Sequence, residues 1–139
     1  MFRNIFIRNK AIDLVDSNEI DLVLRLMFEI AMSDGRLDKM ELDLLKKRAE
    51  EISSDNEKTS DIIKKVIDGA EASVSLYPTV KRINSEYSVE QKKEVLKTLW
   101  TLVAVDGMID HYEENLYFKI ADLLKIRRSQ ANQIKQENS

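Results

Sequence analysis

Apolar residues recur at three- and four-residue steps along most of this chain, the spacing that places side chains on one face of an α-helix. Residues that favour turns are scarce, with 3 Gly and 1 Pro among 139 residues. Together these features predict an all-α fold. A chain of this length usually forms one domain with an ordinary core, so we expect residues 1–139 to make a single helical bundle.

Polar pairs spaced three residues apart mark the starts of several predicted helices as capping boxes. These pairs are Asp16 with Glu19, Asp38 with Glu41, Ser88 with Gln91, and Asp110 with Glu113. The polar stretch 53–58 is predicted to be a loop, and Pro78 is predicted to end the helix before it. The predicted helices cover roughly 16–33, 38–53, 59–77, 79–86, 88–105, 110–124 and 129–139.

The composition excludes several classes of function. With 0 Cys the chain has no disulfide, thiolate metal site or cysteine nucleophile, which fits a reducing compartment, and we expect a cytoplasmic protein. A single His makes a catalytic triad hard to build. The net charge of −3 gives no reason to expect nucleic-acid binding. No apolar run approaches the roughly 20 residues that cross a bilayer, so we expect a soluble protein.

The first eight residues carry several large apolar side chains. They lack the long hydrophobic stretch and small-residue cleavage site of a signal peptide. We expect this segment to dock onto the bundle, and contact with a membrane surface or a partner is the alternative. The apolar residues are Phe2, Ile5, Phe6 and Ile7.

An acidic motif of the form D-G-x-[LI]-D-x-x-E occurs twice, at 34–41 and 106–113. The match extends into the flanking segments, where Phe28 aligns with Trp100. This predicts a duplicated helix-loop-helix whose halves share one core and are related by an approximate two-fold axis. The halves cover roughly 16–76 and 88–139 and are joined by 77–87. The pattern leaves open whether the two loops lie side by side or at opposite ends of the bundle.

One interpretation of the two loops is a divalent cation site. Each loop has three carboxylates, which are hard oxygen ligands, and a glycine that permits a sharp turn. A standard EF-hand is rejected, because its two earliest ligand positions are apolar here in both copies. The candidate ligands are Asp34, Asp38 and Glu41 in the first loop and Asp106, Asp110 and Glu113 in the second.

The other interpretation needs no ion, because the same residues can end one helix and cap the next. The glycines have the expected place of a left-handed residue after a helix, and Leu37 and Ile109 that of hydrophobic staples. Asp38 and Asp110 would be N-caps, with the glutamates as their capping-box partners. Asp34 and Asp106 are not explained in this way, because a carboxylate at a helix C-terminus faces the negative end of the helix dipole.

The two acidic loops, the joining stretch from Leu76 to Asn84 and the run from Leu99 to Leu124 resemble the tellurite-resistance protein B (TerB)-like family, in particular its small stand-alone bacterial members. The resemblance covers roughly Asn18 to Ile134. It implies an all-helical bundle of about seven helices. It also implies divalent-metal binding by the acidic residues, a link to tellurite resistance and stress responses, and no catalysed reaction.

From the residues and the resemblance together, we expect a non-enzymatic binding module. Its two acidic loops would take up Ca²⁺, Mg²⁺, Mn²⁺ or Zn²⁺, or present an acidic surface to a protein partner of a stress-response system. The alternative is an interaction or scaffold domain in which the acids only cap helices. An enzyme that uses carboxylates for metal-assisted hydrolysis is disfavoured, because nothing in the sequence indicates the open coordination position that it needs. The oligomeric state is left open.

Overall fold

The computed structural model describes residues 22–52, 56–72 and 76–139. Within these ranges the chain forms seven helices and no strand, which confirms the all-α prediction and the helix count that the resemblance implies. The first helix is described over residues 22–31. The others are α2 (Lys39–Ile52), α3 (Asn56–Ala72), α4 (Tyr77–Glu86), α5 (Val89–Val103), α6 (His111–Leu123) and α7 (Arg128–Glu137).

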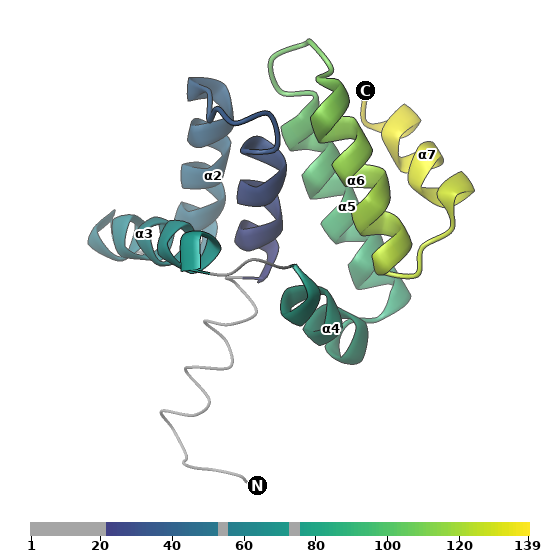
Figure 1. Cartoon of the computed structure of the whole chain (residues 1–139), viewed down its shortest axis with the longest axis horizontal. Helices are drawn as coiled ribbons and strands as arrows, with labels where there is room; N and C mark the ends of the chain where they lie inside the picture. The colour runs from purple at the N-terminus through teal and green to yellow at the C-terminus, as the bar shows by residue number, and fades with distance from the viewer. Residues whose placement is uncertain (1–21, 53–55, 73–75) are drawn as a thin grey trace, which may run out of the picture.

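The longer helices stand side by side and the shorter ones cross them. In Figure 1 the first helix, α2, α5 and α6 run along a common direction, while α3 and α4 lie across one end of the bundle. α7 lies at the edge of the bundle, where it packs on both α5 and α6. This arrangement leaves the turn after the first helix and the turn after α5 at the same end of the bundle.

The core of the C-terminal half is built around aromatic side chains. Trp100 and Tyr117 are fully buried and meet edge to face, with ring centroids 5.1 Å apart. The Tyr117 hydroxyl donates a hydrogen bond of 2.8 Å to the carbonyl of Ala131, which ties α7 to α6. Arg128 stacks 4.2 Å from the centre of the Phe118 ring and adds a cation–π contact to the same interface. The C-terminal helix is therefore an integral part of the packed core.

Several predicted boundaries are confirmed and two are corrected. The helices after Asp38, Ser88 and Asp110 begin where the capping pattern places them. The predicted loop at 53–58 is wrong for residues 56–58, which begin α3, because a helix's first turn is commonly polar and resembles a loop in composition. α4 begins at Tyr77 rather than Thr79, since Pro78 fits the first turn of a helix.

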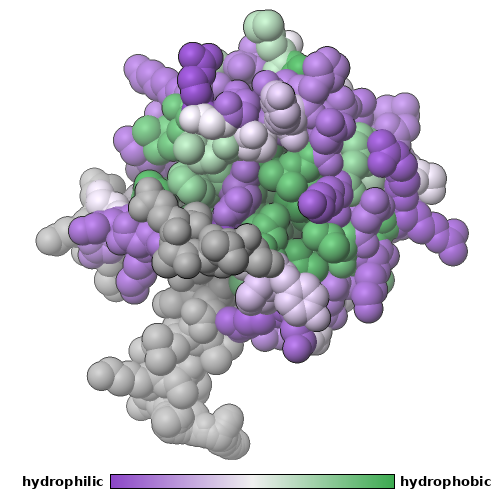
Figure 2. Space-filling view, in the orientation of Figure 1, coloured by the Kyte–Doolittle hydropathy of each residue, from purple (hydrophilic) through white to green (hydrophobic). Residues whose placement is uncertain are grey.

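Some predictions lie outside the described residues. They are the helix start and capping pair at Asp16, the docking of the first eight residues, and positions 53–55 of the predicted loop. Hydrophilic residues cover most of the face shown in Figure 2, with hydrophobic side chains reaching the surface near its middle. None of the described helices combines the length and the apolar character needed to cross a membrane.

Candidate functional site

Both acidic loops begin with the same backbone turn. Gly35 and Gly107 follow the ends of the first helix and α5 with φ angles of +88° and +80°. Their N–H groups donate to the carbonyls of Met32 (2.9 Å) and Ala104 (3.1 Å) and so close the last turn. A side chain at such φ values is strained, which explains why glycine occupies both positions.

The first aspartate of each loop has a local role that the sequence analysis missed. Asp34 Oδ1 accepts a hydrogen bond of 3.0 Å from the N–H of Arg36, and Asp106 Oδ1 accepts one of 3.0 Å from the N–H of Met108. This is the Asx-turn pattern, in which an aspartate binds the backbone two residues ahead. The Asp-Gly dipeptide is itself a turn signal, so the sequence contained the information.

The second aspartates are the N-caps that the sequence predicts, but the two caps differ. Asp38 Oδ1 accepts from Glu41 N–H at 2.8 Å, and Glu41 returns a bond of 3.4 Å by accepting from Asp38 N–H. Asp110 Oδ1 accepts from the N–H groups of Tyr112 (2.8 Å) and Glu113 (3.2 Å). Among the described contacts Asp110 N–H donates no return bond to Glu113, so of the two acidic loops only the first has a complete capping box.

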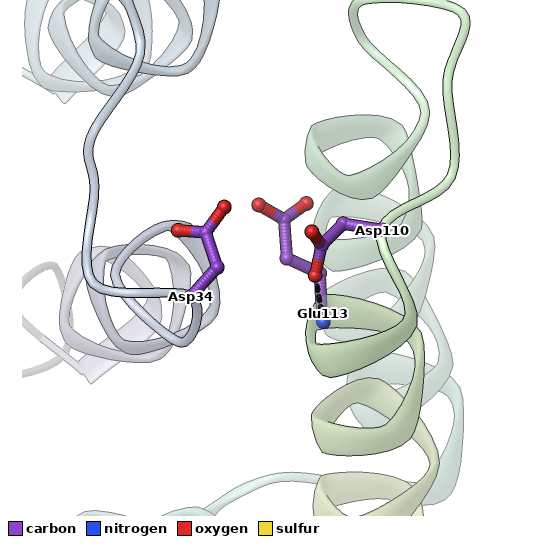
Figure 3. A group of neighbouring side chains, drawn as sticks. All are labelled: Asp34, Asp110 and Glu113. Carbon is purple, nitrogen blue, oxygen red and sulfur yellow. Dashed lines mark hydrogen bonds between the residues drawn. The ribbon is translucent and has the colours of Figure 1, made fainter.

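Three of the six candidate ligands converge across the two loops. Carboxylate oxygens of Asp34, Asp110 and Glu113 all lie within 4.8 Å of one another. Figure 3 shows Asp34 projecting from the turn after the first helix toward Asp110 and Glu113 at the start of α6. The loops are therefore neighbours, which answers the question that the sequence left open. We name these three residues the acidic trio.

The other three candidates have different surroundings. Asp38 and Asp106 are exposed and serve their own loops through the bonds given above. Glu41 is only 3% exposed and lies against Glu113, which is 5% exposed, and the two carboxyl groups share a hydrogen bond. Burial of both glutamates was not anticipated. The signal was present, because each lies four residues before a buried core residue on its own helix, Leu45 in α2 and Tyr117 in α6.

The buried glutamate pair is electrostatically unusual. Burial raises the pKa of Glu113 to about 9, helped by the hydrogen bond with Glu41 and by the negative charges of Glu41, Asp110 and Asp34. Burial also raises the pKa of Glu41, while the hydrogen bond from Glu113 acts in the opposite direction. Both carboxyl groups therefore favour the protonated form more than an exposed glutamate does.

Comparison with known proteins identifies the family. The family model described as "Tellurite resistance protein TerB" matches residues 49–136, more than half of the chain. The chain belongs to the TerB family. Searches of curated proteins and of solved structures found no significant match. The TerB match contains Asp106, Asp110 and Glu113 of the second loop, while the first loop lies before it.

In this TerB family member the acidic trio has the chemistry of a hard-cation site. The ion pairs of the described residues join other acids to Lys or Arg, and none of these pairs includes a member of the trio. Two ligands on opposite sides of a Ca²⁺ ion lie about 4.6–5.2 Å apart, so oxygens within 4.8 Å fit one coordination sphere. A proton on Glu113 or a bound cation would each relieve the repulsion.

Proposed function

We propose that this TerB family member is a non-enzymatic, cytoplasmic binding module that takes up a divalent cation between its two acidic loops and acts with a protein partner in a stress response. The observation that supports the cation most directly is the convergence of Asp34, Asp110 and Glu113 within 4.8 Å. The name of the family supports the link to tellurite resistance. The lack of cysteine and the single His support a role without catalysis.

The donor set favours Ca²⁺, Mg²⁺ or Mn²⁺ over Zn²⁺, because all three donors are carboxylate oxygens. These ions take six or more oxygen ligands, so water or backbone carbonyls would complete the shell. Glu113 must lose its proton to bind the ion, and metal binding therefore releases a proton and strengthens as pH rises. The exposed position of Asp34 leaves the ion a path from solvent.

The test is isothermal titration calorimetry of the whole chain with each of the four cations. Asp34→Asn should weaken binding by about tenfold or more, since it removes one charged ligand. Asp106→Asn is the matched control. It removes the same charge from the equivalent turn and leaves an amide oxygen for the Met108 N–H, but it lies outside the trio. We expect it to change the affinity by less than about twofold.

Two results would overturn the cation proposal. One is the absence of binding heat and of any stabilisation for all four ions. The other is an equal loss of affinity in Asp34→Asn and Asp106→Asn, which would mean that overall charge and not the trio attracts the ion.

A second function is supported by the local hydrogen bonds. A backbone N–H donates a hydrogen bond to each of the four loop aspartates, Asp34, Asp38, Asp106 and Asp110, so each has a structural role that needs no cation. In that case the acidic loops present charge to a basic partner surface. Thermal unfolding distinguishes the two proposals, because a cation that binds only the folded state raises Tm with its concentration and a scaffold shows no such change.

A further inference from the structure

Exposed apolar side chains gather around the acidic loops at one end of the bundle. Eight large hydrophobic side chains of the described residues are exposed, and five of them lie in or next to these loops, at 36% to 77% exposure. In Figure 2 pale green atoms project at the top of the molecule, the end where Figure 1 shows the turn after α5. We name these five residues the apolar rim: Met32, Met40, Met108, Ile109 and Tyr112.

The apolar rim borders the acidic trio. Met108 and Ile109 immediately precede Asp110 in the chain. Tyr112 immediately precedes Glu113. Consecutive Cα atoms are about 3.8 Å apart, so the Cα of each of these apolar residues lies within about 8 Å of that of a trio residue. Since the trio joins the two loops within 4.8 Å, the apolar and acidic side chains form one surface.

The first loop shows that the turn itself does not need these apolar side chains. Arg36 stands at the position equivalent to Met108, and its N–H makes the same 3.0 Å bond to the aspartate of the turn. Leu37 packs against the core, whereas the equivalent Ile109 is exposed. The second loop thus exposes three large apolar side chains within five residues without a local structural reason. Clustered exposed apolar side chains bordered by polar groups mark interaction sites.

The charge of this surface is negative. The loops 34–41 and 106–113 together contain six carboxylates and two basic side chains, Arg36 and Lys39. Both basic side chains belong to the first loop, and the second has no Lys or Arg. The four aspartates of the loops are exposed or half-buried, so their charge reaches solvent. The most exposed apolar residues are therefore those with only acidic charge beside them in their loop.

This charge selects the kind of partner. Anionic lipids and nucleic acids would be repelled, and so would the same surface of a second copy. A basic surface is attracted, and one face of an amphipathic helix offers apolar and basic side chains together. Methionine side chains are flexible and suit such a contact.

We propose that a basic amphipathic helix of another protein docks on this surface, with its apolar residues on Met108 and Tyr112 and its Lys or Arg side chains toward Asp106 and Asp110. The inference rests on the protein partner of the proposed function and gives that partner a chemistry. It does not depend on the cation.

The test is a fluorescence anisotropy titration with the full chain in EDTA, so that no cation takes part. The probe is a labelled 18-residue peptide of Leu and Lys whose leucines recur at helical spacing. The paired change Met108→Gln and Tyr112→Gln should weaken binding about fivefold or more. The matched control pair, Val89→Gln and Leu123→Gln, removes two exposed apolar side chains at the opposite ends of α5 and α6. It should stay within about twofold of the unmodified chain.

Two further measurements separate charge from apolar contact and this inference from the cation proposal. The same peptide with Glu in place of every Lys should bind at least about tenfold more weakly. Calorimetry with the cation should give the same affinity for both variant pairs, because none of the four side chains belongs to the trio. Absence of cation binding by the unmodified chain would overturn the cation proposal alone. Unchanged fluorescence of buried Trp100 would show that the variants are folded.

Four results would overturn the docking proposal. The first is no binding of the Leu-Lys peptide by the unmodified chain. The second is an equal loss of affinity in the two variant pairs, and the third is equal affinity for the Glu peptide. The fourth is a dimer in sedimentation, or binding to anionic phospholipid vesicles, that Met108→Gln and Tyr112→Gln abolish. That result would assign the surface to a second copy or to a membrane.

Discussion

The two acidic loops have the same backbone turn, yet their side chains meet different surroundings. In both, a glycine of positive φ ends a helix, an aspartate closes the turn and a second aspartate caps the next helix. The first loop contributes only Asp34 to the acidic trio, whereas the second contributes Asp110 and Glu113. Local hydrogen bonding therefore accounts for what the loops share, and tertiary packing accounts for how they differ.

The two glutamates show this difference most clearly. Glu41 completes a capping box by accepting a hydrogen bond from Asp38 N–H, while Glu113 lacks the equivalent bond and has a pKa raised to about 9. Because Glu113 accepts no capping hydrogen bond from Asp110 N–H, its carboxyl group can face Asp34 and Asp110 and bind an ion with them. One motif can thus supply a structural cap in one copy and a candidate ligand in the other.

The largest effect that we expect is stabilisation by Glu113→Gln in the absence of cations. Burial raises the pKa of Glu113 to about 9 in the folded protein, and an unfolded glutamate has a pKa of about 4.3. The folded state therefore binds more protons, so stability present below about pH 4 is lost as pH rises toward 9. Glutamine does not ionise and can donate to Glu41, so we expect a gain on the order of 2 kcal/mol near pH 8 and almost none near pH 4.

Urea unfolding across this pH range measures the effect. Asp106→Asn is again the matched control, since it removes one negative charge from the exposed equivalent loop. Its stability should follow that of the unmodified chain at every pH. If Asp106→Asn gave the same gain, the net charge of the protein and not the burial of Glu113 would be the cause.

The next effect tests what the loops have in common. Gly35→Ala and Gly107→Ala should each lower the free energy of unfolding by about 1–2 kcal/mol, because alanine is strained at positive φ. A Cβ at either position meets nothing within 4 Å, so strain is the only cost. Chemical denaturation should give nearly equal losses. A loss confined to one loop would contradict the equivalence of the two turns.

Replacement of the two capping aspartates separates stability from cation binding. Asp38→Ala and Asp110→Ala should each lose about 1 kcal/mol of stability, since each side chain caps a helix N-terminus. Only Asp110→Ala should also weaken cation binding, because Asp38 lies outside the trio. Denaturation and calorimetry on the same pair of variants measure both quantities. Equal loss of cation affinity in the two variants would contradict the asymmetric site.

The features that the sequence predicted are mostly local ones. Helical periodicity and caps such as Ser88 and Asp110 depend on residues a few positions apart, and the structure confirms both. The approach of Asp34 to Glu113 depends on how two helix pairs pack, which no short-range pattern encodes. Burial of Glu41 and Glu113 likewise arises from packing. The relation of the two halves by duplication and a two-fold axis remains a prediction from the repeated motif.

The smallest expected effect concerns the two aliphatic residues before the caps. Leu37 packs against the hydrophobic core, as a hydrophobic staple does, whereas Ile109 is 41% exposed. Leu37→Ala should therefore cost roughly 0.5–1 kcal/mol and Ile109→Ala less than about 0.5 kcal/mol, measured by urea unfolding. A larger loss at Ile109 would mean that the second loop is held by apolar packing as firmly as the first.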